Sequence, residues 1–294
     1  MVRQAHHERF YIHQERRGTS LVYEADSLTE LPLVAVVTGT MIRFIAVAFF
    51  LLFTLQPRAE VPQVLSVVSS ANRAALLELY TSEGCSSCPP ADRFMSQLKN
   101  SDISDQQLIP LSFHVTYWDY IGWRDRFANN QYDDRQRKQA MLNAGRSVYT
   151  PQFMLNGKDY RHYRSLDTDV QRINTQAAAY QLKLTAIPQT DSISVKLNIR
   201  RLLDNHEKAI AYLALYEHNL TSAVTDGENE GERLHHDYVV RELKGPYSLE
   251  QDQAEVKAAF AHRDYKIEDS GVVAFIQKPL SSEVLQAVRL ELMQ

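Results

Sequence analysis

The chain has 294 residues with 32 Lys and Arg against 36 Asp and Glu, which gives a formal net charge of −4. This length accommodates one large domain or two modest ones. Because there is no excess of basic residues, nothing in the composition points to nucleic acid as a partner. Two cysteines are too few for a disulfide-built scaffold.

The first part of the chain reads as a targeting region. Residues 1–40 are crowded with charge and are expected to be a non-native or disordered extension, with Met41 as the true start. Residues 41–59 place Arg43 before an apolar run and end near Ala59, which is the layout of a secretory signal peptide. The run is short for a membrane span, which needs about 20 residues.

This layout predicts an exported protein, periplasmic or secreted. The alternative is that the same segment stays uncleaved as an anchor. Contact with a membrane is expected only through that N-terminal segment.

Both cysteines lie in the segment 85–92, which reads Cys-Ser-Ser-Cys-Pro-Pro-Ala-Asp. An apolar run over 74–80 predicts a buried strand before it, and 89–98 has prolines at its entry and apolar residues at helical spacing. A Cys-x-x-Cys at a helix start indicates thiol redox chemistry, because the helix dipole favours a thiolate there. Cys85, outside the helix, is expected to be exposed and to attack, and Cys88, more buried, to resolve. An inert structural disulfide and a pair of metal ligands are the alternatives.

Downstream, 108–115 predicts a second strand and 129–144 a helix. The segment 116–125 between them is aromatic and carries Trp118 and Trp123. These rings are expected either to form a substrate surface beside the thiols or to fold onto the core.

Thr150 and Pro151 precede a short apolar strand that ends at Asn-Gly, a hairpin signal. In thioredoxin-like folds a cis-proline at this place in the chain faces the cysteines and helps to hold the substrate chain. We expect Pro151 to have that role, with Thr150 beside it as part of the substrate surface; an ordinary trans proline in a turn is the alternative. A helix is expected over 165–184. The order of elements from 73 to 184 is that of a thioredoxin-like domain.

Residues 187–294 have the pattern of an antiparallel β-rich part. Strict alternation predicts a strand over 192–200, and further strands are expected over 209–217, 237–243 and 272–277. Helices are expected over 249–261 and 282–292. The predicted fold class is therefore α/β: a thioredoxin-like domain with an added C-terminal antiparallel β-rich part.

Four segments carry a resemblance to a known family: 78–92 with the cysteine motif, 114–125, 148–157 and 227–234. Together they resemble a family of secreted bacterial thioredoxin-like proteins that is catalogued as a domain of unknown function. The resemblance covers about residues 73–279. It implies the fold and export, and it supplies no activity. Thioredoxins place a buried acid six residues before the first cysteine; here that position is Leu79, so the neighbouring Glu78 is the candidate for proton relay to Cys88.

The sequence thus predicts an exported thiol–disulfide oxidoreductase that needs no diffusible cofactor and exchanges electrons with a redox partner protein or a thiol substrate. One alternative is a copper-binding or metallochaperone protein that uses Cys85, Cys88 and His114. The other is a non-catalytic binding module whose disulfide is structural.

Overall fold

The computed structural model describes residues 63–145, 147–203, 207–261 and 264–293, which belong to one compact unit, Val61–Gln294. The predicted extension over 1–40 and the predicted signal segment over 41–59 lie outside the described residues. No helix in the described ranges is long and apolar enough to cross a membrane.

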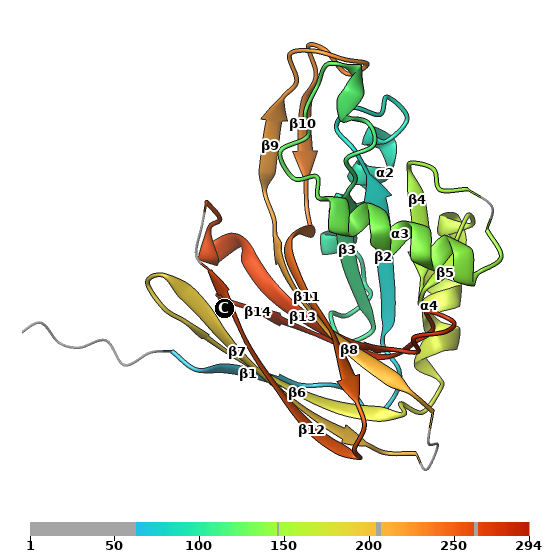
Figure 1. Cartoon of the computed structure of the whole chain (residues 1–294), viewed down its shortest axis with the longest axis vertical. Coiled ribbons are helices and arrows are strands. Elements are labelled where there is room, and N and C mark those ends of the chain that lie inside the picture. The colour runs from blue at the N-terminus through green and yellow to red at the C-terminus, as the bar shows by residue number, and fades with distance from the viewer. Residues whose placement is uncertain (1–62, 146, 204–206, 262–263, 294) are drawn as a thin grey trace, which may run out of the picture. The chain divides into compact units, whose positions relative to one another are not determined.

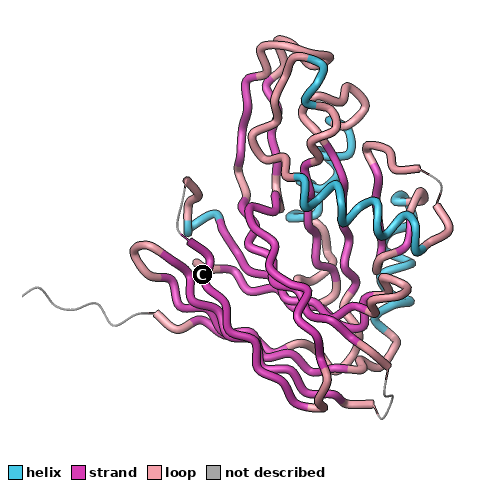
Figure 2. Tube along the Cα trace, in the orientation of Figure 1, coloured by secondary structure: helices cyan, strands magenta, loops and turns pink. Residues whose placement is uncertain are grey.

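Strands predominate over helices in the described residues (Figures 1 and 2). The helices are α2 (Pro89–Gln97), α3 (Asn130–Leu142) and α4 (Leu166–Asn174). The strands are β1 (Leu65–Val68), β2 (Ala75–Thr81), β3 (Leu108–His114), β4 (Gln152–Leu155), β5 (Lys158–Asp159), β6 (Tyr180–Pro188), β7 (Ser192–Arg201), β8 (Ala209–Glu217), β9 (Leu220–Ala223), β10 (Arg233–His236), β11 (Val239–Leu249), β12 (Gln253–Ala261), β13 (Ser270–Gln277) and β14 (Val284–Glu291).

Three sheets organise these strands. The largest has eight strands in the order β14-β13-β8-β11-β3-β2-β4-β5, a second has four in the order β1-β6-β7-β12, and β9 and β10 form a hairpin. The predicted α/β thioredoxin-like class is therefore wrong: the chain is mostly β, built on a large mixed sheet. One apolar core lies between β6, β7 and β12 of the four-stranded sheet and β8, β13 and β14 of the eight-stranded one.

The predicted division between residues 184 and 187 is also wrong, because it falls inside β6. Strands from both sides of it share the eight-stranded sheet, joined where β11 pairs in parallel with β3 at Val239 and Ser112. The C-terminal strands are thus an integral part of the sheet that carries the cysteine region.

Two predicted helices, and the last residues of a third, are strands. The segment 249–261 contains β12, which pairs along its whole length with β7, and 282–292 contains β14, which pairs with β13. Both are rich in Ala, Glu, Gln and Leu, good helix formers, but pairing within a sheet overrides that preference. The helix predicted over 165–184 ends at Asn174, and β6 starts at Tyr180.

The pairing of β2, β3 and β4 decides where the cysteines lie. β2 runs parallel to β3, so that Thr81 lies beside His114 at one edge of the sheet. β4 runs antiparallel to β2, with Gln152 beside Tyr80. The start of β4, preceded by Thr150 and Pro151, therefore lies next to the loop that leaves β2 and carries Cys85.

Alternate residues of β2 face opposite sides of the sheet, as a pleated strand requires. Leu77 and Leu79 pack in a core with α2 and α4, whereas Leu76 and Tyr80 pack in a core that includes Tyr132 of α3. Thr81 therefore faces the α2 side, and Glu78 faces the α3 side.

Candidate functional site

The Cys-x-x-Cys segment lies where β2 passes into α2. Cys88 is the N-cap residue of α2, its carbonyl accepts from the backbone N–H of Ala91 (2.8 Å), and prolines follow at the first helical positions. Both thiols are free and hydrogen-bond each other. The predicted strand–turn–helix context of the cysteines is confirmed, and it places Cys85 just beyond a helix N-terminus, where the dipole favours an anion.

Hydrogen bonds make Cys85 the more acidic of the two thiols. The Cys88 thiol, the Ser87 hydroxyl at 3.2 Å from the sulfur, and the Thr150 hydroxyl together outweigh burial and lower the pKa of Cys85 to about 6. Burial, and then the neighbouring Cys85, raise the pKa of Cys88 far above its ordinary value. The pair therefore divides into one sulfur that ionises readily and one that keeps its proton.

The expected exposure of Cys85 is wrong. Its side chain and that of Cys88 are both 0% exposed, whereas Ser86 and Ser87 between them are exposed. Because the chain turns tightly here, with Cys88 N–H donating to the Cys85 carbonyl (3.1 Å), these two serines form the outer side of the turn. In this arrangement of the turn, the Cys85 sulfur is closed to solvent.

Thr150 and Pro151 lie beside the thiols, as the sheet register requires. The Thr150–Pro151 bond is cis, as predicted, and the Thr150 hydroxyl hydrogen-bonds the Cys85 sulfur. The Trp118 indole N–H in turn donates to Thr150 Oγ1 (2.7 Å). The structure thus brings together Cys85, Cys88, Thr150, Pro151 and Trp118, and the substrate-holding role of Pro151 stays a prediction.

Trp123 lies elsewhere in the site. Its indole N–H donates to Glu83 Oε2 (2.8 Å), and Glu83 is fully buried in the loop that precedes Cys85. Trp123 therefore helps to hold this loop, and its part in a substrate surface stays a prediction.

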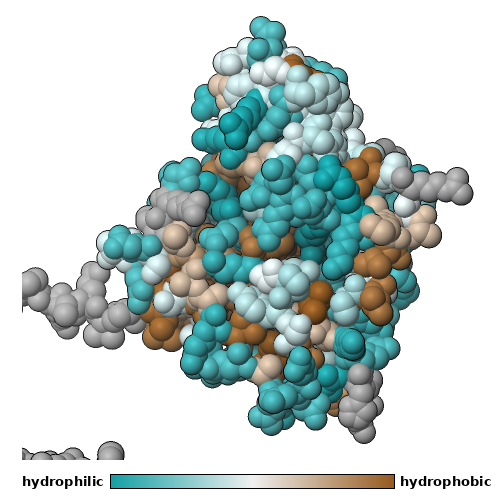
Figure 3. All heavy atoms as spheres, viewed as in Figure 1, coloured by the Kyte–Doolittle hydropathy of each residue, from teal (hydrophilic) through white to brown (hydrophobic). Residues whose placement is uncertain are grey.

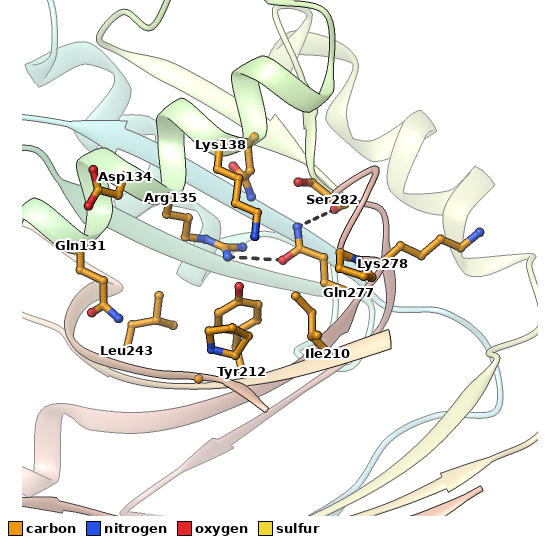
Figure 4. Close-up of a pocket in the computed structure, with 14 residues that line it drawn as sticks. Gln131, Asp134, Arg135, Lys138, Ile210, Tyr212, Leu243, Gln277, Lys278 and Ser282 are labelled. Carbon is orange, nitrogen blue, oxygen red and sulfur yellow. Dashed lines mark hydrogen bonds between the residues drawn. The ribbon is translucent and has the colours of Figure 1, made fainter. Parts of the chain in front are cut away.

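Glu78 does not contact the cysteines. Its carboxylate accepts from Arg135 (2.7 Å) and from Gln139 Nε2 (2.8 Å), both on α3, and its residue is 0% exposed. Arg135 continues this network to Gln277, which Figure 4 shows at the wall of a pocket of about 200 Å³. The proposed relay through Glu78 is wrong because alternation along β2 turns this side chain to the α3 side.

His114 ends β3 inside a buried group of charged residues. Its Nδ1 lies 2.6 Å from Asp125 Oδ2. Burial alone would lower the pKa of His114, but the Asp125 carboxylate raises it to about 8. The ring contacts that of His236 edge to face, with centroids 4.9 Å apart. Within the described ranges, no group of three or more His, Cys, Asp and Glu side chains is arranged to hold a metal ion.

Two grooves flank the start of α2. One, of about 380 Å³, is lined by Ser87 and Pro151 with the rings of Tyr149, Phe153, Tyr160 and Tyr163. The other, of about 610 Å³, runs between α2 and the β9–β10 hairpin and is lined by Ser86, Asp92 and His236, with acidic residues at its mouth. The two grooves meet the Cys-x-x-Cys turn from opposite sides, at Ser87 and Ser86.

The family described as "Protein of unknown function (DUF1223)" matches residues 76–277, well over half of the sequence. The chain belongs to this family. The match includes the cysteine segment, the Thr150–Pro151 segment and the β9–β10 hairpin.

Solved structures share the fold. Protein AGR_C_4864 from Agrobacterium tumefaciens is 22% identical, with a TM-score of 0.55 over 76% of this chain and 96% of that one. HBP35 of Porphyromonas gingivalis is 12% identical, with a TM-score of 0.59 over 76% of each chain. Comparison with curated proteins finds no match. At these identities the likeness establishes the fold of this DUF1223 chain and nothing about its chemistry.

Sequence reasoning missed the residues that hold the cysteine turn from the hairpin side. Asn229 Nδ2 donates to the carbonyls of Glu83 (2.8 Å) and Cys85 (3.1 Å), and Glu228 Oε2 accepts from Ser86 N–H (3.0 Å). The only signal in the sequence was the segment 227–234, which contributed to the family resemblance without a role. Asp92 and Thr81, which lie next to Cys88, were also missed.

Proposed function

We propose that this chain is a thiol–disulfide oxidoreductase in which Cys85 attacks and Cys88 resolves. The observation that carries the proposal is the pairing of two free thiols of unequal acidity at the start of α2, with the pKa of Cys85 lowered to about 6. A thiolate is the species that attacks a disulfide, and a nearby second thiol is needed to release the mixed disulfide that results.

The groove of about 380 Å³ supports a substrate that is a polypeptide. It is lined by Ser87, which lies between the two cysteines in the sequence, and by Pro151 and aromatic rings. Such a surface suits an extended chain with apolar side chains on either side of the disulfide. Electrons are exchanged with that chain or with a redox partner protein, and no diffusible cofactor takes part.

Full burial of both sulfurs favours a second candidate, a binding module in which the pair forms a structural disulfide. The reduction potential distinguishes the two functions. A value between about −120 and −270 mV supports the oxidoreductase, whereas a value below about −300 mV identifies a structural bond.

Trapping provides the direct test. A Cys88→Ser variant is expected to accumulate a mixed disulfide with a disulfide-bonded peptide, because nothing then resolves the adduct on Cys85. The matched Cys85→Ser variant is expected to form none. Adduct formation at Cys88 in preference to Cys85, or no adduct in either variant, would contradict the proposal.

Export remains part of the proposal, supported by the apolar segment that precedes residue 59. N-terminal sequencing of the protein recovered from its native host tests it. A mature chain that starts near residue 60 supports cleavage of a signal, and one that retains residues 1–40 contradicts it.

A further inference from the structure

Cys88, the resolving thiol, must lose its proton before it can attack, and a hydroxyl group lies next to its sulfur. The side chain of Cys88 is fully buried, and Thr81 at the end of β2 hydrogen-bonds its sulfur. The Thr81 hydroxyl donates to Asp92 Oδ2 (3.3 Å), and Asp92 lies on the first turn of α2. While the Cys85 sulfur is free, the Cys88 S–H donates to it. Once Cys85 is joined to a substrate, the Thr81 oxygen, whose own proton goes to Asp92, is the acceptor available to the Cys88 S–H.

Asp92 is the carboxylate at the inner end of a buried group. His236 of β10 faces it with Nδ1 3.8 Å from Oδ2, while Nε2 of the same ring lies 3.2 Å from Glu83 Oε1. His114 of β3 and Asp125 of the following loop complete the charged groups around it. His236 is 1% exposed, and Nδ1 has no hydrogen-bond partner among the described residues.

The groove between α2 and the β9–β10 hairpin connects this group to solvent. Asp92 and His236 both line it, and Glu230 and Glu232 stand exposed at its mouth. On the face shown in Figure 3, the end of the unit that carries β9 and β10 presents mainly hydrophilic side chains. A contiguous series of polar groups therefore runs from the buried Cys88 sulfur to water.

We propose that Asp92 accepts the proton of Cys88 through the Thr81 hydroxyl during resolution, and that His236 passes it to the groove. This inference rests on the proposed oxidoreductase function. It assigns to Asp92 and Thr81 the relay role that was predicted for Glu78, whose carboxylate is bound by Arg135 on the other side of the sheet.

A mixed disulfide joins Cys85 to the substrate. Cys88 gives its proton to Thr81 as Thr81 gives its own to Asp92, and the Cys88 thiolate attacks the Cys85 sulfur. The Cys85–Cys88 bond forms, the bond to the substrate breaks, and its electron pair leaves with the substrate thiolate. The protein is oxidised by two electrons and the substrate disulfide is reduced; in the opposite direction the same groups return the proton.

Burial makes Asp92 a stronger base than an exposed carboxylate. Burial raises the pKa of Asp92 above its ordinary value, although His236 and His114 oppose this effect. A carboxylate with a raised pKa is a better proton acceptor than an exposed one, and it sits beside a thiol whose own pKa burial raises.

Stopped-flow reaction of the reduced protein with dithiobis(nitrobenzoate) separates the two steps, because attack by Cys85 and resolution by Cys88 each release one coloured thiolate. Asp92→Asn is expected to leave the first release unchanged and to slow the second by about 100-fold at neutral pH. The second release should then rise with hydroxide concentration. Asp133→Asn, a matched buried acid on α3 that binds Thr116, is expected to change neither release.

Thr81→Val gives an independent measurement, with the same selective slowing expected and with rescue by Thr81→Ser. An equal effect on both releases in Asp92→Asn and Thr81→Val, or an unchanged second release in either folded variant, would overturn the inference while leaving the oxidoreductase function intact. Absence of a second release from the unaltered protein would instead refute the oxidoreductase function.

Discussion

The Trp118 indole donates its hydrogen bond to the Thr150 hydroxyl at 2.7 Å. Because this hydroxyl accepts from the indole, its own proton is left for the Cys85 sulfur. The sequence predicted Thr150 beside the thiols, and Trp118 either there or on the core; the two residues thus orient a donor at the Cys85 sulfur.

Thr150→Val is expected to raise the pKa of Cys85 from about 6 by about one to two units. A hydrogen bond to a charged group contributes about 1.5–3 kcal/mol, and one pKa unit corresponds to about 1.4 kcal/mol. Thiolate absorbance in the ultraviolet, followed against pH, measures the shift. Thr150→Ser keeps the donor and should keep the midpoint; an unchanged midpoint in Thr150→Val would argue against this hydrogen bond.

Glu78→Ala is expected to lower the free energy of unfolding by about 3–5 kcal/mol, since it leaves the buried Arg135 guanidinium without its carboxylate. Urea denaturation measures the loss. The paired change Glu78→Leu with Arg135→Met should recover much of it, because no buried charge then remains. If Glu78→Ala instead slowed the release of a mixed disulfide in a fully stable protein, the structural role assigned to Glu78 would be wrong.

Asp125→Asn is expected to lower the free energy of unfolding most between about pH 4 and pH 6.5. The pKa of His114 is raised to about 8, so its share of the pair's stabilisation is complete below its ordinary 6.5 and disappears as pH rises through 8. The pKa of Asp125 is lowered, so its share is present above 3.8 and is lost as pH falls further.

Urea unfolding at pH 6 and pH 9 compares the two regimes for Asp125→Asn. The loss in free energy of unfolding should be about 3–5 kcal/mol at pH 6 and about 2 kcal/mol smaller at pH 9. Asp133→Asn provides the control, with an expected loss that does not change between these pH values. An equal loss at both pH values for Asp125→Asn would contradict a pKa of His114 raised to about 8 by Asp125.

Asn229→Ala is expected to speed alkylation of Cys85 by about tenfold. The variant removes two hydrogen bonds that tie the cysteine turn to the hairpin, and a loss of about 1–2 kcal/mol makes the open turn about ten times more populated. Mass spectrometry after timed alkylation gives the rate. Asn198→Ala on β7, which removes an exposed hydrogen bond to Glu255, should leave it unchanged. A slower reaction in Asn229→Ala would mean that access to Cys85 does not depend on this contact.

The sequence predicted well those elements that depend on neighbouring residues in the chain. The run that became β2, the prolines at the start of α2 and the helix over α3 depend on neighbours in sequence. β12 and β14 were missed because residues favourable to a helix are held in strands by partners far along the chain. Glu78 was misplaced although alternation along β2 already separates it from Leu79. The contacts of Asn229 with the cysteine turn and of Asp92 with His236 join segments more than a hundred residues apart, and no periodicity encodes them.

The parallel contact between β11 and β3 has a practical corollary for dissection of the protein. In a fragment that stopped at residue 184, β3 would lose its pairing with β11 and become an edge strand. The backbone hydrogen-bonding groups around Ser112 would then be free to pair with a strand of another molecule. Excising the thiol region as a stand-alone piece should therefore yield a self-associating polypeptide, and the whole span from β1 to β14 is the smallest unit worth purifying.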